Sequence, residues 1–533
     1  MKKVLSTLTT PIFSVQLSII IIAYIFLLNQ LHHWSFSSAL HSLWVSLALL
    51  ILTLSLGIFH RFILKSLLIV HVALGSIAIF AKQNYGTIIT EDLMLSALIS
   101  EQDLTAEMIS PLFIFWFILT AVLPSIWIIL VNIRSQPLSV LLKQYAFTVF
   151  ICLSMIAAFF WQQGYHFRSA GHIRDERFTQ DLGYFSPVDA EYNLHRAVRA
   201  SKKIQQTYAN AKSLASQYHY QSQVDDLLVV FVLGESTRGD HFAINGYNKP
   251  TNPLLSKVPH LISFSHATSC DTLTINSIHC LASPMLKTQG DRNITHASFG
   301  EVMAKMGYDT EIYALQTLTG FYRYLHADTL KTKYAIVNEQ STGSKDISLI
   351  PYAKKTIENY HQGKKLLILH TLGSHQTYVD RFTNEQAVFT PYCTNPDVAQ
   401  CQHQELINAY DNSVVAVDQL LGTLIDALST KKAVLIYVSD HGESLGEHGY
   451  YFHGQPVNTA PKEQFNIPFV VWLSDSYRQT PHGRAFHHNL QQALASQTEV
   501  SHDHVFHSLL GCAGIWSDDG GIDKTLNLCG DYQ

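Results

Sequence analysis

Apolar residues are concentrated at the front of this chain, and this distribution restricts its fold more than any other feature. Five stretches there have about the length that a helix needs to cross a bilayer, ~20 residues: 13–28, 43–59, 62–80, 112–131 and 146–161. No comparable run follows residue 162 of the 533-residue chain. A single run could be a buried core helix or, for the first, a signal peptide, but five in succession predict a membrane domain over residues 1–161.

Basic residues indicate the orientation of these spans, because cytoplasmic loops retain Lys and Arg. They precede the first span and lie between the second and third and between the fourth and fifth: Lys2, Lys3, Arg61, Lys65, Arg134 and Lys143. The other loops lack basic residues or are acidic. Five spans that start inside end outside, so we expect the rest of the chain to be exported. The net charge of -5 argues against a nucleic-acid partner.

Cysteine usage agrees with export, since disulfides form in oxidising compartments. Cys152 lies inside the fifth span, and the other six follow as Cys270/Cys280, Cys393/Cys401 and Cys512/Cys529. Six cysteines allow fifteen pairings. We prefer pairing between neighbours, which would stabilise each short loop by about 2–3 kcal/mol. Zinc binding by cysteine is the competing interpretation, but no Cys-x-x-Cys spacing supports it.

The exported part has the pattern of an α/β domain over residues 223–533, after a linker and a surface helix in 162–222. Continuous apolar strands are predicted at 227–233, 366–370, 433–438 and 469–473, with helices between them, one of which covers 410–428. Such strands indicate a mostly parallel sheet covered by helices on both faces. In these sheets, functional residues gather just past the carboxyl ends of the strands.

Acidic and imidazole side chains follow three of the predicted strands. One strand leads to Glu235, another to Asp440 and His441, and a third to the segment from His370 to His375. Zinc accepts carboxylate and imidazole ligands and, at a catalytic site, leaves one position for a reacting group. Glu235, Asp440 and His441 are therefore candidate zinc ligands, with a deprotonated hydroxyl as the fourth. A lone Asp-His pair can also be a capped turn with a solvated histidine.

Three groups of motifs resemble the lipopolysaccharide phosphoethanolamine transferases. They are Val232 to His241 with Asn245-Gly246-Tyr247, Ser269 to Thr274 with Cys280, and Ser439 to Glu447 with His453-Gly454. The match covers essentially the whole chain. It implies an exported domain of the alkaline phosphatase and sulfatase type, behind a membrane domain of five helices.

The resemblance also implies roles for single residues. Thr274 stands where the family has its nucleophile, shortly after the first cysteine of a disulfide. The zinc ligands that it implies are Glu235, Thr274, Asp440 and His441, while His375 and His453 match histidines that hold the phosphoethanolamine group or a second metal. A Cys270–Cys280 bond would restrict the nucleophile loop. Ser236 and Thr237, beside the glutamate ligand, suit a helix N-cap instead.

The implied reaction consists of two in-line displacements. Zinc stabilises the alkoxide of a threonine, which is otherwise a weak nucleophile. Attack on phosphatidylethanolamine would give a phosphoethanolamine-threonine intermediate and release diacylglycerol, and lipopolysaccharide would then displace the threonine. We expect a monomer in the bacterial inner membrane with its catalytic domain in the periplasm. Whether one or two Zn2+ ions bind, and whether Ca2+ is also required, stays open.

Two branches of this family differ in the acceptor. The Kdo branch is favoured by Tyr313 to Gln316, Phe321-Tyr322, Ala327-Asp328 and Asp518 to Ile522, and a lysine of the lipid A branch has no clear counterpart. Kdo2-lipid A is therefore the preferred acceptor, and a lipid A phosphate, the modification linked to polymyxin resistance, is the alternative. Two other classes stay open: a membrane-tethered phosphodiesterase or sulfatase, although the Cys/Ser-x-Pro-x-Arg motif of sulfatases is absent, and a catalytically silent envelope protein that binds lipopolysaccharide.

Histidines are abundant, and most of the 28 must be exposed or structural. We expect this ordinary role for six that the motifs do not single out: His241, His370, His448, His502, His504 and His507.

Overall fold

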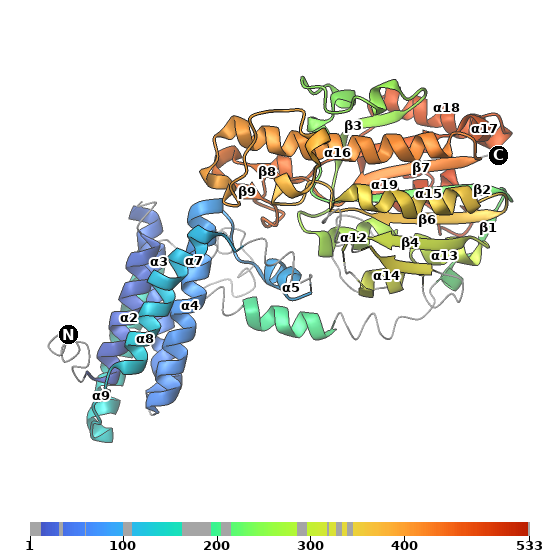
Figure 1. Ribbon diagram of the computed structural model, residues 1–533. Helices are drawn as coiled ribbons and strands as arrows, with labels where there is room; N and C mark the ends of the chain where they lie inside the picture. Colours follow the sequence, from blue (N-terminus) through green and yellow to red (C-terminus); the bar gives the residue numbers. More distant parts are fainter. Residues whose placement is uncertain are drawn as a thin grey trace. The chain divides into compact units, whose positions relative to one another are not determined.

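The computed structural model describes residues 12–530 except for nine gaps: 31–35, 59, 100–108, 163–192, 204–214, 285–295, 317–318, 327–332 and 338–344, with the side chains of a few neighbouring residues also left aside. The chain forms two compact units (Figure 1). The first comprises Met1–Met94 and Ile109–Val198, and the second comprises Leu95–Met108 and Arg199–Gln533.

The first unit is a bundle of apolar helices, as predicted. Its elements are α2 (Ser14–Asn29), α3 (Phe36–Gly57), α4 (Arg61–Tyr85), α7 (Pro111–Phe117), which continues through the π-helix η1 (Ile118–Val122) into α8 (Leu123–Leu130), and α9 (Leu138–Gln162). A short helix, α5 (Glu91–Ile99), follows α4. Among the described residues, three helices are long and apolar enough to cross a membrane, namely Arg61–Tyr85, Pro111–Leu130 and Leu138–Ala158. Ser14–Asn29 and Ser46–Gly57 are shorter apolar helices.

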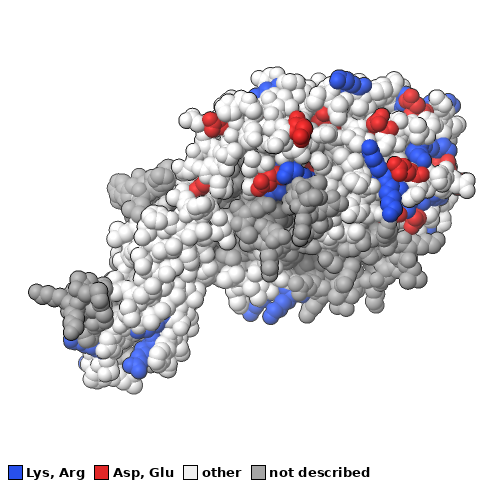
Figure 2. All heavy atoms as spheres, in the orientation of Figure 1, with Lys and Arg blue, Asp and Glu red and all other residues white. Residues whose placement is uncertain are grey.

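One end of this bundle brings together the start of α4, which carries Arg61 and Lys65, and the connection between α8 and α9, which carries Arg134. Ile12 bridges Ile133, which places the start of α2 beside the connection between α8 and α9. Lys65, near the start of α4, donates to the carbonyls of Ile129 and Val131 at the end of α8. The visible face of the bundle is nearly free of charged side chains except for Lys and Arg at one end (Figure 2). This is the distribution expected of alternating membrane spans.

A polar network inside the bundle satisfies the backbone where α7 passes into α8. Pro124 has no N–H to donate to the carbonyl of Thr120, four residues earlier. The Tyr24 hydroxyl of α2 donates to that carbonyl at 2.9 Å. Ser76 of α4 contacts the Thr120 hydroxyl at 2.6 Å and accepts at its carbonyl from the Trp116 indole. An apolar environment requires such partners, because water cannot replace them there.

The second unit is built on an eight-stranded sheet with the order β11-β3-β10-β7-β2-β6-β4-β5. Its strands are β2 (Leu227–Gly234), β3 (Ile262–Thr268), β4 (Asp309–Ala314), β5 (Lys333–Ile336), β6 (Lys364–His370), β7 (Ala433–Ser439), β10 (Asn466–Leu473) and β11 (Val500–Ser501). All neighbouring pairs are parallel except those of β10, which runs antiparallel to both β3 and β7. The sheet is therefore mixed but largely parallel.

Helices cover both faces of this sheet, and the central strand β2 is fully buried along its length. One group contains α12 (Thr274–Ala282), α13 (Phe299–Lys305), α14 (Thr319–His326) and α19 (Asp503–Cys512), which share a core with alternate residues of β2 such as Val229 and Phe231. The other contains α15 (Ile350–Asn359) and α16 (His403–Leu428), which pack on each other and lie across the opposite face (Figure 1). Two short helices, α17 (Asp475–Arg478) and α18 (Pro481–Ala495), follow β10.

Smaller elements complete the second unit. β1 (Tyr220–Ser222) pairs with β12 (Ile515–Ser517), and β8 (Ser444–Leu445) pairs with β9 (Tyr451–Phe452). Before the domain, a helix covers residues 193–203, Ala215–Gln217 is a separate 3-10 turn, and Tyr220 is already in a strand. The expected linker lies almost entirely outside the described residues, as do Ala327 and Asp328.

Candidate metal and nucleophile site

The candidate site lies at one edge of the sheet, where several strands end. β2, β6 and β7 are mutually parallel, so Gly234, His370 and Ser439 reach the same edge. β3 is antiparallel to β10 and therefore runs in the same direction as β7, which brings the loop after Thr268 to this edge as well. The residues of three separate sequence motifs thus meet, as expected for the carboxyl ends of parallel strands.

Glu235, Asp440 and His441 form a group whose ligand atoms lie within 4.8 Å of one another, as a metal site requires. His441 Nε2 lies 3.3 Å from Glu235 Oε1 and 3.3 Å from Asp440 Oδ2. All three residues are buried. His441 Nδ1 lies 2.8 Å from the carbonyl of Gly442, to which it can only donate, so Nε2 is left as the metal-binding atom.

The charges in this group favour a cation. Burial raises the pKa of Asp440, and the neighbouring Glu235 carboxylate raises it further. Burial would lower the pKa of His441, but Asp440 and Glu235 outweigh it and raise that pKa. Asp440 Oδ2 is buried and makes no hydrogen bond among the described residues. Two neighbouring buried carboxylates, one with an oxygen that accepts no hydrogen bond from the described part of the chain, fit the donor chemistry of zinc.

Thr274 is the first residue of α12 and lies against this group. Its Oγ1 is 3.2 Å from Glu235 Oε2 and 3.2 Å from His441 Nε2, and its side chain is partly exposed. Asp271 shapes the preceding loop by accepting from the backbone N–H groups of Thr272 and Leu273. The positive end of the α12 dipole is located at Thr274, which favours an anionic group there.

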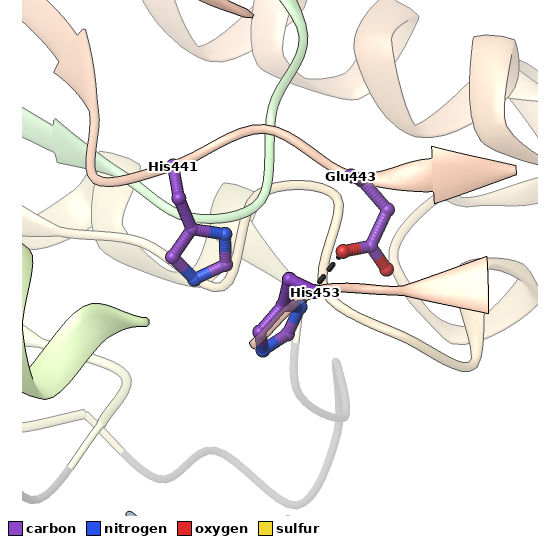
Figure 3. A group of neighbouring side chains, drawn as sticks. All are labelled: His441, Glu443 and His453. Carbon is purple, nitrogen blue, oxygen red and sulfur yellow. Dashed lines mark hydrogen bonds and ion pairs between the residues drawn. The ribbon is translucent and has the colours of Figure 1, made fainter. Parts of the chain in front are cut away.

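His453 and Glu443 lie beside His441 (Figure 3). The ring centroids of His441 and His453 are 4.1 Å apart, and those of His375 and His453 are 5.7 Å apart. His441, Glu443 and His453 form a second group with the spacing of metal ligands. Burial lowers the pKa of both His375 and His453 to about 3, so both imidazoles are neutral at neutral pH.

Two residues of the sequence motifs contact the site although they were not predicted as site residues. Gln316, just past the end of β4, donates to Glu235 Oε2 at 2.9 Å and to the carbonyl of Thr371 at 3.0 Å. Glu443 accepts from the Tyr378 hydroxyl and lies 2.7 Å from His453 Nδ1. A signal existed for both, because Gln316 follows a strand of the sheet and Glu443 follows Asp440 and His441 directly.

The prediction that Ser236 and Thr237 cap a helix is wrong. Ser236 donates its hydroxyl to Glu235 Oε1 and its N–H to Asp440 Oδ1, and it has a positive φ of 52°. Thr237 donates its N–H to the Ser439 hydroxyl. The short 3-10 helix that follows begins at Gly239 and has no side-chain cap. These residues instead hold two strand ends together.

Most of the remaining histidines have structural contacts. His241 pairs with Asp411, His370 with the Tyr322 hydroxyl, and His507 accepts from the N–H of Asp523. His504 accepts from the N–H of Ser501, and His448 is exposed. His502 differs from these, because it contacts two loops of the site.

Three disulfides join the cysteines in the preferred order, Cys270–Cys280, Cys393–Cys401 and Cys512–Cys529. Cys152 is free and buried in α9. Only the first disulfide encloses a residue of the candidate site, since Thr274 lies between its two cysteines.

The sheet and the carboxylate-imidazole cluster at its edge define a sulfatase-type domain, and comparison with known families agrees. The family model described as Sulfatase matches residues 228–515, which is more than half of the chain. A second model, described as Phosphoethanolamine transferase EptA/EptB, matches residues 44–200. The chain belongs to the EptA/EptB phosphoethanolamine transferase family, within the sulfatase superfamily.

Individual relatives show how far the similarity extends. The Kdo(2)-lipid A phosphoethanolamine 7''-transferase of Escherichia coli (strain K12) is 35% identical over 59% of this chain and 57% of that protein. The phosphatidylethanolamine transferase Mcr-2 of Escherichia coli is 29% identical over 85% of this chain and 84% of that protein. The chain thus spans little more than half the length of the first of these relatives.

A solved structure matches both units. The integral membrane protein lipooligosaccharide phosphoethanolamine transferase A (EptA) from Neisseria meningitidis is 25% identical, with a TM-score of 0.78, over 97% of this chain and 96% of that one. The chain is accordingly an integral membrane protein with several spans.

Proposed function

We propose that this enzyme transfers phosphoethanolamine from phosphatidylethanolamine to lipopolysaccharide, with Thr274 as the nucleophile. One observation carries the proposal: a partly exposed hydroxyl, Thr274 Oγ1, lies 3.2 Å from Glu235 and 3.2 Å from His441 at the start of a helix. A purely structural role for this hydroxyl would not require two buried ionisable partners together with exposure to solvent.

The donor set at this point fits zinc. Glu235, Asp440 and His441 would hold one Zn2+ ion with Thr274 as the fourth ligand, and a bound zinc ion supplies the positive charge that stabilises the threonine alkoxide. A second ion would have Glu443 and His453 as ligands, with His375 nearby, because Nε2 of His441 belongs to the first ion and Nδ1 of His441 contacts the carbonyl of Gly442. The proposal covers one or two zinc ions, and a requirement for Ca2+ has no support in the described residues.

The protein groups can carry the two displacements as follows. In the first, a bond forms between Thr274 Oγ1 and the lipid phosphorus, and the bond from phosphorus to the glycerol oxygen breaks. The Thr274 proton passes to the neutral imidazole of His453 or His375 and from there to the departing diacylglycerol. In the second, the acceptor hydroxyl gives its proton to that imidazole, attacks phosphorus and releases Thr274.

The chain would be placed in the inner membrane with its second unit in the periplasm. Five helices, the spans of residues 1–161, would cross the bilayer, with the basic end of the bundle in the cytoplasm. Three disulfides in the second unit support an oxidising compartment. We expect the working form to be a monomer.

The proposed acceptor is the Kdo sugar of Kdo2-lipid A, and a lipid A phosphate is the alternative. The name of the Escherichia coli relative at 35% identity supports the Kdo sugar. The test is incubation of the purified full-length chain with phosphatidylethanolamine and Kdo2-lipid A, followed by mass spectrometry with fragmentation. Phosphoethanolamine on Kdo is the expected result. Phosphoethanolamine on a lipid A phosphate would select the alternative, and continuous release of diacylglycerol without an acceptor, beyond one equivalent per enzyme, would indicate a hydrolase.

A further inference from the structure

The loop that carries Thr274 and the loop that carries Asp440 and His441 follow two strands that are not neighbours in the sheet. Thr274 follows β3, and Asp440 and His441 follow β7, but β10 lies between these strands and runs in the opposite direction. β10 begins at this edge, whereas β3 and β7 end there. β3 and β7 therefore share no ladder of backbone hydrogen bonds. On the backbone the two loops are related only indirectly, through the segment before β10, where Ser269 N–H donates to the carbonyl of Phe465 and Gly442 N–H donates to the carbonyl of Gln464.

His502 spans this gap with both nitrogens of its ring. The N–H of Cys270, in the nucleophile loop, donates to His502 Nδ1 at 3.2 Å. His502 Nε2 lies 2.9 Å from the carbonyl of Ser439, the residue before Asp440. A carbonyl only accepts, so Nε2 carries the proton and Nδ1 is the acceptor. One neutral imidazole thus connects the two loops.

The backbone of His502 is fixed in its turn. His502 is fully buried, and its N–H donates to the carbonyl of Thr268, the last residue of β3. The preceding residues Val500 and Ser501 form β11, which pairs with β3. The side chain therefore projects from the end of β3, where the nucleophile loop begins, to the end of β7.

We propose that His502 is a positioning residue for the transfer reaction, which sets the distance between Thr274 and the ligands Asp440 and His441. The inference rests on the proposed function. His507 lies in α19, the helix that begins directly after His502, and provides the contrast. It is also buried and also accepts one backbone N–H, but that N–H belongs to Asp523 and not to either loop. Displacement of an attacking atom by about 1 Å can cost about 100-fold in rate.

The test compares four variants of the full-length chain, at saturating zinc, for diacylglycerol release from phosphatidylethanolamine in the presence of Kdo2-lipid A. His502→Leu removes both bonds, His502→Asn keeps an acceptor near the position of Nδ1, and His502→Gln keeps a donor near Nε2. His507→Leu is the matched control for loss of a buried imidazole. For each, kcat, the KM for phosphatidylethanolamine, the zinc content and the thermal midpoint are measured.

His502→Leu is expected to lower kcat by about 10- to 100-fold, the range for residues that orient metal ligands, with the KM unchanged. His507→Leu is expected to lower only the thermal midpoint. The Asn and Gln variants should each recover part of kcat. Should His502→Leu fail to fold, these two variants carry the test, with kcat reduced in both at an unchanged KM.

Two results would overturn the inference. One is a kcat for His502→Leu equal to that of the His507→Leu control or, where His502→Leu does not fold, such a kcat for both amide variants; the other is a rise in KM at constant kcat. Thr274→Ala in the same assay separates this inference from the proposed function. If Thr274→Ala is inactive while the His502 variants are fully active, only the positioning role is wrong. If Thr274→Ala is active, the proposed reaction itself is wrong.

Discussion

Glu443 Oε2 lies 2.7 Å from Nδ1 of His453, which fixes the orientation of an imidazole whose ring is 4.1 Å from that of His441 (Figure 3). The Nδ1 atom is engaged by Glu443, so Nε2 faces the site. Glu443 in turn accepts from the Tyr378 hydroxyl at 2.8 Å and is fully buried. Through this contact the carboxylate positions His453.

Replacement of this carboxylate should affect turnover more than folding. Glu443→Gln keeps the size of the side chain but weakens the hold on His453, so we expect kcat to fall by about 10- to 100-fold. Tyr378→Phe removes one hydrogen bond from the same carboxylate and should have a smaller effect in the same direction. Steady-state kinetics of diacylglycerol release gives the comparison, and a Glu443→Gln enzyme with normal kcat would exclude this role.

Gln316 should influence metal affinity through Glu235. Its amide is a hydrogen-bond donor to Glu235 Oε2, so Gln316→Leu leaves that buried oxygen without this partner. We expect zinc affinity to fall by about 10- to 100-fold, as measured by competition with a chelator. Gln386→Leu is the matched control, because Gln386 is equally buried but donates to Gln419. Equal zinc affinity in the two variants would contradict the prediction.

The disulfides allow stability to be separated from catalysis. Cys270–Cys280 and Cys393–Cys401 close loops of similar length, 10 and 8 residues apart, so loss of either should cost about 2.5 kcal/mol on the chain-entropy estimate. Only the first encloses Thr274. Two double serine variants are compared, one of Cys270 and Cys280 and one of Cys393 and Cys401, by transfer activity at temperatures where both are folded. We expect the first variant to lose activity and the second to keep it.

Buried neutral histidines should make the second unit sensitive to acid. Burial lowers the pKa of His507 to about 4, against about 6.5 in an unfolded chain. The unfolded state therefore binds more protons between these values, so the stabilisation is complete above pH ~6.5 and is lost as the pH falls towards ~4, by about 3 kcal/mol at most. Denaturant unfolding of wild type and His507→Asn across this range provides the check, with a shallower pH dependence expected in the variant. An identical pH dependence would contradict it.

Much of the fold could be predicted because its central strands are buried on both faces. β2, β6, β7 and β10 are continuous apolar runs, and such runs are visible in a sequence. The direction of a strand cannot be read from such a run. β10 is antiparallel to β3 and β7, although it is as apolar as the parallel strands of the sheet. β3 was missed because only alternate residues such as Ile262 and Phe264 are buried, which gives a weaker pattern.

The site was predicted less completely, because the type of a residue does not reveal which other residues lie near it in the folded chain. Glu235, Asp440, His441 and Thr274 come together as expected, and their roles as ligands and nucleophile remain predictions. Gln316 and His502 are separated from these residues by long stretches of sequence, and only the order of the strands brings them near. Ser236 and Thr237 have the composition of a helix cap, but their partners lie across the sheet at Asp440 and Ser439.

The central claim is that the group being transferred is attached for a time to Thr274. The most direct measurement is mass spectrometry of the purified chain after incubation with phosphatidylethanolamine and zinc in the absence of lipopolysaccharide. We predict one phosphoethanolamine adduct, located by peptide fragmentation to Thr274 and discharged when Kdo2-lipid A is added. An adduct at another residue, or turnover of the lipid with no adduct and no loss of activity in Thr274→Ala, would contradict the account.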